Sequence, residues 1–118
     1  MMDLFRKSGT VPCLLQSERS ECGLACLAMV AAYHGKVMDL NTMRHDYPVS
    51  AHGATLSDIL GIADRLQLSG RALRLEMEDL AALQLPAILH WDMIHFVVLV
   101  KVSKKSITIH DPAVGRRR

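Results

Sequence analysis

Apolar residues in the first half of the chain recur at the three- and four-residue intervals of a helix. Between residues 20 and 35 they form one stripe, which consists of Leu24, Leu27, Ala28, Ala31 and Ala32. Ser20 is of the type that caps a helix start, and Gly35 can end the helix in a left-handed conformation. The pattern therefore predicts a helix whose first turn contains Cys22.

Two shorter helices are predicted to follow. The first of them can begin after Asp39 and must end before Pro48, because the residue before a proline is disfavoured in the helical conformation. The other begins after Thr55, where Asp58 completes a capping-box pattern. Its apolar face consists of Leu56, Ile59, Leu60, Ala63 and Leu66. We interpret these stripes as core-facing.

The second half of the chain changes to the alternating pattern of extended structure. Leu73 and Leu75 alternate with polar residues, and a short helical piece is predicted near residues 79–83. Strands are predicted over residues 87–91, 95–102 and 106–111, with a turn at 92–94, a polar loop at 103–105 and Pro112 as the stop. The last two strands would form an antiparallel hairpin. We therefore predict an α+β fold, in which a helical layer packs on a small antiparallel sheet.

The size and charge of the chain limit its functions. A chain of 118 residues, half of them hydrophobic, can bury one core, so we expect a single domain over residues 1–118. The net charge of +2 is too small to indicate nucleic-acid binding, and we interpret the basic run at residues 116–118 as a solvated end. The most apolar region, residues 87–102, is interrupted by histidine and charged residues, and the N-terminus has no secretory-signal pattern. We expect the chain to be soluble by itself.

The cysteines are odd in number, which argues against a disulfide framework. Cys22 and Cys26 lie one turn apart on the same predicted helix, and Cys13 precedes it. Reduced thiols in a cytosolic setting fit this arrangement best. A metal or redox protein that uses Cys22, Cys26 and histidines remains an alternative, but the chain has no Cys-x-x-Cys pair and its histidines are scattered. We therefore expect no metal site.

Cys22 has the position of a nucleophile. Unpaired N–H groups and the partial positive charge at a helix start favour the thiolate form of a cysteine. The neighbouring carboxylate of Glu21 opposes this effect, so a histidine partner is needed. Cys26, deeper on the apolar face, is interpreted as a core residue, and Cys13 has no activating feature.

The predicted hairpin can supply the histidine together with a carboxylate. A loop centred on Ser103 would place His95 directly opposite Asp111, on the same face of the sheet. Apolar pairs would follow toward the loop, Val97 with Ile109 and Leu99 with Ile107. Asp111 would then orient the imidazole of His95. A register slip of one residue would send the two side chains to opposite faces, and the apolar pattern does not exclude it.

Five segments of the chain carry a family resemblance. They are residues 16–30 (QSERSECGLACLAMV), 53–56 (GATL), 86–91 (PAILHW), 95–99 (HFVVL) and 110–113 (HDPA). The chain resembles, over nearly its whole length, the papain-like cysteine peptidase domain carried by bacteriocin and microcin exporters. Those exporters are ABC transporters that cleave double-glycine leader peptides while exporting the cargo.

The resemblance implies a role for each matching residue. Cys22 would be the nucleophile, His95 the base, Asp111 the orienting carboxylate and Gln16 the oxyanion-hole donor. The substrate would be a peptide cut after Gly-Gly or Gly-Ala and preceded by an amphipathic leader helix. Trp91 is the candidate wall of a narrow channel that admits glycine, although a core aromatic is an equally good interpretation.

The resemblance also implies partners and a place in the cell. The membrane and nucleotide-binding parts of the transporter are absent, so we interpret the chain as a C-terminally truncated fragment of an exporter at the cytoplasmic side of the bacterial inner membrane. The peptidase would need no cofactor, and ATP would serve the nucleotide-binding part. The alternative is a peptidase-like module that tethers cargo without proteolysis, as in relatives that have lost the cysteine.

Overall fold

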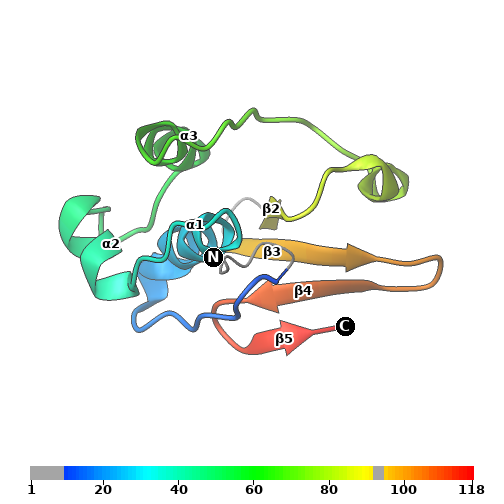
Figure 1. Cartoon of the computed structure of the whole chain (residues 1–118), viewed down its shortest axis with the longest axis horizontal. Helices are drawn as coiled ribbons and strands as arrows, with labels where there is room; N and C mark the ends of the chain where they lie inside the picture. Colours follow the sequence, from blue (N-terminus) through cyan, green and yellow to red (C-terminus); the bar gives the residue numbers. More distant parts are fainter. Residues whose placement is uncertain (1–9, 92–94) are drawn as a thin grey trace, which may run out of the picture.

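The computed structural model describes residues 10–91 and 95–118, and its helices lie against a four-stranded antiparallel sheet (Figure 1). The strands are β2 (Ala87–Trp91), β3 (His95–Val102), β4 (Ile107–Asp111) and β5 (Gly115–Arg117), side by side in that order. The helices are α1 (Cys22–Tyr33), α2 (Leu40–Asp46) and α3 (Leu56–Arg65), and the 3-10 helices are η1 (Arg19–Glu21) and η2 (Met77–Ala82). The predicted α+β fold is confirmed.

Helix α1 is the central element of the core and packs on β3. Its residues are buried nearly all round, and Leu24, Cys26 and Met29 are each 0% exposed. Burying a leucine or methionine side chain contributes about 1.5–3 kcal/mol, so this helix is stabilised mainly by tertiary packing. Figure 1 shows that α1 meets the sheet where β3 begins and β4 ends.

The start of α1 differs from the prediction. Ser20 is not its cap, because Ser20 lies inside the 3-10 turn η1 and Glu21 occupies the N-cap position without a side-chain cap bond. The predicted stop is confirmed. Gly35 has φ 88°, and the N–H of Lys36 donates to the carbonyl of Ala31 at 2.8 Å, the pattern of a Schellman ending.

The two other helices begin where their caps predict. Asp39 accepts a bond from the Thr42 N–H at 2.7 Å, and Thr55 and Asp58 form a reciprocal capping box. One detail of the predicted α3 face is wrong. Leu56, in the first turn, is 39% exposed, and its place in the core is taken by Ile62, which is 7% exposed.

The register of the β3–β4 hairpin also differs from the prediction. The observed pairs are Val98 with His110, Leu99 with Ile109, Lys101 with Thr108 and Val102 with Ile107. The turn closes through a bond from the Ser103 N–H to the carbonyl of Ser106, so it centres beyond Ser103, and a bulge lies between Leu99 and Lys101. The predicted direct pairing of His95 with Asp111 is therefore wrong, because continuing this register places Asp111 opposite Val97.

Two segments of the second half differ from the prediction. Residues 71–76 form no strand, because no strand within residues 10–91 and 95–118 pairs with them. Leu73 is 54% exposed, and Leu75 packs on the cluster around Leu80. Residues 115–117 form the strand β5, which pairs with β4. Arg116 and Arg117 were predicted to belong to a solvated end. The tight turn before β5 needs Gly115 at φ 105°. The turn predicted at residues 92–94 lies outside the described residues.

Candidate active site

Cys22 is the first residue of α1, as predicted. A helix start is the place where backbone N–H groups lack partners within the helix, and Cys22 occupies this position. Cys22 is 7% exposed, while Cys26 is fully buried, and burial raises the pKa of the Cys26 thiol well above its usual range. Cys26 is therefore a core residue, as expected. Cys13 is exposed, and all three cysteines are free thiols.

His95 and Asp111 form a close pair. His95 Nε2 lies 2.7 Å from Asp111 Oδ1, and the exposed fractions of the two side chains are 28% and 10%. The same Oδ1 accepts a bond from the Ala113 N–H at 2.9 Å, which fixes the carboxylate in the turn after β4. With Asp111 as the acceptor, the proton of a neutral imidazole is on Nε2. The nitrogen that remains to take a proton is Nδ1.

The pair forms although its members are not opposite each other in the ladder. In the observed register Asp111 continues β4 opposite Val97, and His95 lies two residues from Val97 on β3. A two-residue offset keeps both side chains on one face, and such diagonal neighbours are within reach of a long side chain. The register prediction was wrong by two residues, so the predicted face was right.

Packing at the start of α1 brings the residue after Cys22 close to β3, the strand that begins with His95. A Cβ atom at Gly23 would lie 2.6 Å from Ile59 Cδ1 and 3.4 Å from Phe96 Cδ2. The residue after Cys22 therefore lies close to the residue after His95, and a side chain at this position would require Ile59 to shift. The Asp111 charge also acts on the Cys26 thiol, one turn after Cys22.

Gln16 reaches the same end of the sheet from the N-terminal segment. Its backbone N–H donates to the carbonyl of Pro112 at 2.9 Å, directly after Asp111 in the chain. Its side-chain Nε2 donates to the carbonyl of Glu18 at 2.9 Å. The loop from Gln16 to Cys22 is thus anchored beside the carboxylate of Asp111.

From the sequence, Glu21 was expected to place an unpaired carboxylate beside Cys22. In the structure this carboxylate has a partner. Arg44 on α2 donates a hydrogen bond from Nε to Glu21 Oε2. This bond, more than any other effect, lowers the pKa of Glu21 below its ordinary value, although burial opposes it. Sequence reasoning missed Arg44, since nothing in the spacing pairs it with Glu21.

Trp91 is the ladder partner of His95. The two residues face each other across β2 and β3, so their side chains emerge on the same face of the sheet. Trp91 is 45% exposed, which excludes the alternative of a core aromatic. Its neighbour His90 instead stacks on Phe96, with ring centroids 4.2 Å apart.

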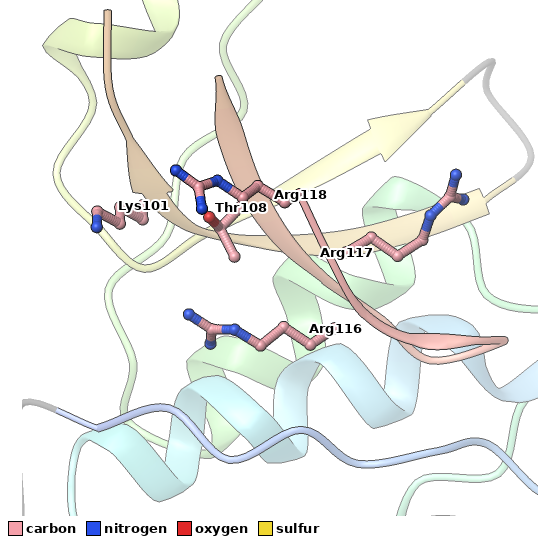
Figure 2. Close-up of a pocket in the computed structure, with 5 residues that line it drawn as sticks. All are labelled: Lys101, Thr108, Arg116, Arg117 and Arg118. Carbon is pink, nitrogen blue, oxygen red and sulfur yellow. The ribbon is translucent and has the colours of Figure 1, made fainter. Parts of the chain in front are cut away.

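A basic cavity of about 310 Å³ lies elsewhere on the sheet (Figure 2), lined by Lys101, Thr108, Arg116, Arg117 and Arg118. In Figure 2, Arg117 points away from the other cationic side chains. Arg116 Nη1 lies 2.8 Å from Nε2 of the buried His110. No predicted site residue lines this cavity.

Over residues 10–91 and 95–118, no three His, Cys, Asp or Glu side chains gather as a metal site would require. Within the same residues, no helix has the length and apolarity to cross a membrane.

Comparison with known proteins agrees with this geometry. Residues 10–118 match the model of the Peptidase C39 family. The chain is 52% identical over 107 residues to the probable microcin-H47 secretion/processing ATP-binding protein of Escherichia coli, covering 91% of this chain and 15% of that protein. It is 50% identical over 117 residues to the colicin V secretion/processing ATP-binding protein of Escherichia coli, covering 99% of this chain and 17% of that protein. The chain thus spans about a sixth of the length of these curated relatives.

Two solved structures share the fold. One is a double glycine motif protease from an AMS/PCAT transporter in complex with the leader peptide, with a TM-score of 0.84 and 39% identity over 95% of this chain and 81% of that one. The other is the peptidase domain of Streptococcus ComA, a bi-functional ABC transporter involved in quorum sensing, with a TM-score of 0.79 and 26% identity over 89% of this chain and 82% of that one. The chain belongs to the Peptidase C39 family and forms a papain-like cysteine peptidase domain.

Proposed function

We propose that this domain removes double-glycine leader peptides from bacteriocin- or microcin-like precursors, cutting after Gly-Gly or Gly-Ala. The observation that carries the proposal is the 2.7 Å pair of His95 and Asp111 at the end of the sheet where α1 begins with Cys22. A nucleophile at a helix start, a base and a carboxylate that orients the base are the parts that acyl transfer needs. The names of the relatives, which describe secretion and processing, support this substrate class.

The residues divide the reaction between them. The Cys22 thiolate attacks the carbonyl carbon of the second small residue, forming a C–S bond and an oxyanion. The side-chain N–H of Gln16 and the backbone N–H of Cys22 stabilise that oxyanion. His95, protonated at Nδ1, gives this proton to the leaving amine as the C–N bond breaks. A water molecule then attacks the acyl-enzyme and gives one proton to His95. The C–S bond breaks to restore the thiolate, and the leader leaves as a carboxylic acid that loses its remaining proton to solvent.

Trp91 supplies the selection for small residues. Its position opposite His95, its exposure and its size fit a side wall of the channel that leads to Cys22. Such a wall admits glycine and rejects a substrate residue with a bulky Cβ substituent. The amphipathic leader helix would bind by its apolar face in a hydrophobic groove.

The domain acts as one part of an ABC exporter. Its partners are then the membrane and nucleotide-binding parts of the transporter, which hold it at the cytoplasmic side of the bacterial inner membrane. ATP serves the nucleotide-binding part, and the peptidase chemistry uses groups of this chain and water. The two Escherichia coli relatives, named as secretion/processing ATP-binding proteins and far longer than this chain, support this arrangement.

Cleavage of designed precursors tests the proposal. The wild type and Cys22→Ala are incubated with peptides that carry Gly-Gly, Gly-Ala or Gly-Val before the cut, and the products are read by mass. We expect the wild type to cut the first two after the second residue and Cys22→Ala to cut none. A tethering module would bind the leader without cutting it. It would give a binding signal in calorimetry with Cys22→Ala, while the wild type would leave the same peptide uncut. That outcome would replace the peptidase proposal.

A further inference from the structure

We propose that Glu21 and Arg44 form a positioning pair, which holds the loop of residues 16–22 in its working shape and cancels the negative charge beside Cys22. The proposal rests on the peptidase function above and adds two residues to it. Neither touches the reacting atoms, so each would act through Gln16 and Cys22. We call residues 16–22 the nucleophile loop.

Glu21 holds the nucleophile loop through its backbone. Its Oε1 atom accepts bonds from the N–H groups of Ser17, at 2.9 Å, and Glu18, at 3.1 Å. The Glu18 carbonyl in turn accepts a bond from Gln16 Nε2, at 2.9 Å, and one from the Glu21 N–H, at 3.1 Å. The amide of Gln16 is therefore oriented by a peptide that Glu21 fixes. Losing the carboxylate would release the oxyanion donor without touching it.

Arg44 supplies the opposite charge from a different element. Its Nε atom bonds Glu21 Oε2, and its Nη1 atom donates to Asn41 Oδ1 at 2.6 Å, so the guanidinium is held on α2. The side chain of Glu21 is 3% exposed and that of Arg44 36% exposed. A carboxylate so deeply buried needs a partner, and truncating one member leaves an uncompensated charge.

The pair matters for chemistry because Glu21 is bonded to Cys22 along the chain. An unpaired carboxylate there would raise the pKa of the thiol and oppose the helix start. Among the described side chains, Glu18 in the same loop acts on Arg44, and Asp111 of β4, which is paired with His95, acts on the Cys26 thiol of α1. Arg44 is the cation that the structure pairs with Glu21. Removing Arg44 should raise the pH midpoint of Cys22 alkylation, and removing the Glu21 charge should lower it.

Two variants and one control test the pair. Glu21→Gln presents an amide N–H to Arg44 in place of an acceptor, and Arg44→Gln leaves the Glu21 charge uncompensated. Asp79→Asn is the matched control, since Asp79 Oδ2 accepts the Glu76 N–H at 2.9 Å in the other 3-10 helix, η2. Each protein is assayed for kcat and KM on the double-glycine peptide, for the pH midpoint of Cys22 alkylation by peptide mapping, and for thermal unfolding.

We expect both variants to lower kcat by about 10²-fold with little change in KM, because displacing an aligned group by about 1 Å has that effect. Arg44→Gln should raise the alkylation midpoint of Cys22 by about one pH unit, and Glu21→Gln should lower it. Asp79→Asn should leave kcat and the midpoint as in the wild type. If the pair is merely structural, both variants should lower thermal stability, and the alkylation midpoint of Cys22 should either stay unchanged or shift in the same direction in both. Either result for the midpoint would overturn the proposal.

These measurements distinguish failure of the positioning pair from failure of the proposed peptidase function. If the wild type does not cleave any leader peptide, the proposed function fails, while the alkylation midpoints still report whether Arg44 balances Glu21. If the wild type cleaves and both midpoints stay unchanged, the positioning pair is wrong and the peptidase stands. Should Glu21→Gln fail to fold, Arg44→Gln, altered at a partly exposed side chain, decides the matter by its midpoint alone.

Discussion

Asp111 Oδ1 lies 2.7 Å from His95 Nε2, although the β3–β4 register does not place the two residues opposite each other. The bond therefore depends on both the shared face of the strands and the turn after β4, where Oδ1 also accepts the Ala113 N–H. Because Asp111 can only accept when ionised, it selects the tautomer with the proton on Nε2. This relationship makes Nδ1 the basic nitrogen of the site.

Asp111→Asn should reduce peptide cleavage by a factor on the order of 10²–10⁴, since general-base catalysis contributes about that much. The amide can present an N–H to Nε2 and so favour the wrong tautomer. Single-turnover cleavage measures the loss, and thermal unfolding shows whether the fold persists. A variant that folds and cleaves at the wild-type rate would show that Asp111 does not orient His95.

Gly23→Val should destabilise the fold by about 1–3 kcal/mol, because an added side chain would overlap Ile59 and press on Phe96. Gly61→Val is the control, since Gly61 also lies inside a helix, but a Cβ atom there would meet no other described part of the chain within 4 Å. Chemical denaturation gives both free energies of unfolding. Equal values for the two variants would mean that the α1 start is not closely packed.

The pKa of Glu21 is lowered in the folded state, chiefly by the bond from Arg44. A carboxyl with a depressed folded pKa contributes stability that is present above its unfolded value, here 4.5, and is lost as the pH falls through the folded value. We expect the free energy of unfolding to fall below about pH 4.5 in the wild type and to fall less steeply in Glu21→Gln. Parallel curves from pH 7 to pH 3 would contradict this.

Much of the site could be predicted from local signals. The helix that begins at Cys22 has apolar spacing and a terminal glycine, and the caps at Asp39 and Thr55 are each recognisable within a few residues. The turn before β5 also has a local signal, because Pro112 and Gly115 bound a short loop. These features depend on neighbours along the chain.

The features that were missed depend on distant parts of the chain. The strand β3 is apolar on both faces, so its pattern left the register open, and the bulge between Leu99 and Lys101 has no sequence signal. The alternation at Leu73 and Leu75 predicted extended structure, but these residues pair with no strand in the described part of the chain and so form none themselves. The contact between Glu21 and Arg44 joins residues 23 positions apart, and only the packing of α2 beside α1 brings them together.

The proposed mechanism requires Cys22 to act as an ionised nucleophile with His95 as its partner. The most direct measurement is the alkylation rate of Cys13, Cys22 and Cys26 against pH, in the wild type and in His95→Ala, resolved by peptide mapping. We expect Cys22 to react readily near pH 6, Cys26 to stay protected by burial, and the Cys22 advantage to fall in His95→Ala. Three thiols that react equally slowly near pH 6, with no effect of His95→Ala, would contradict the claim.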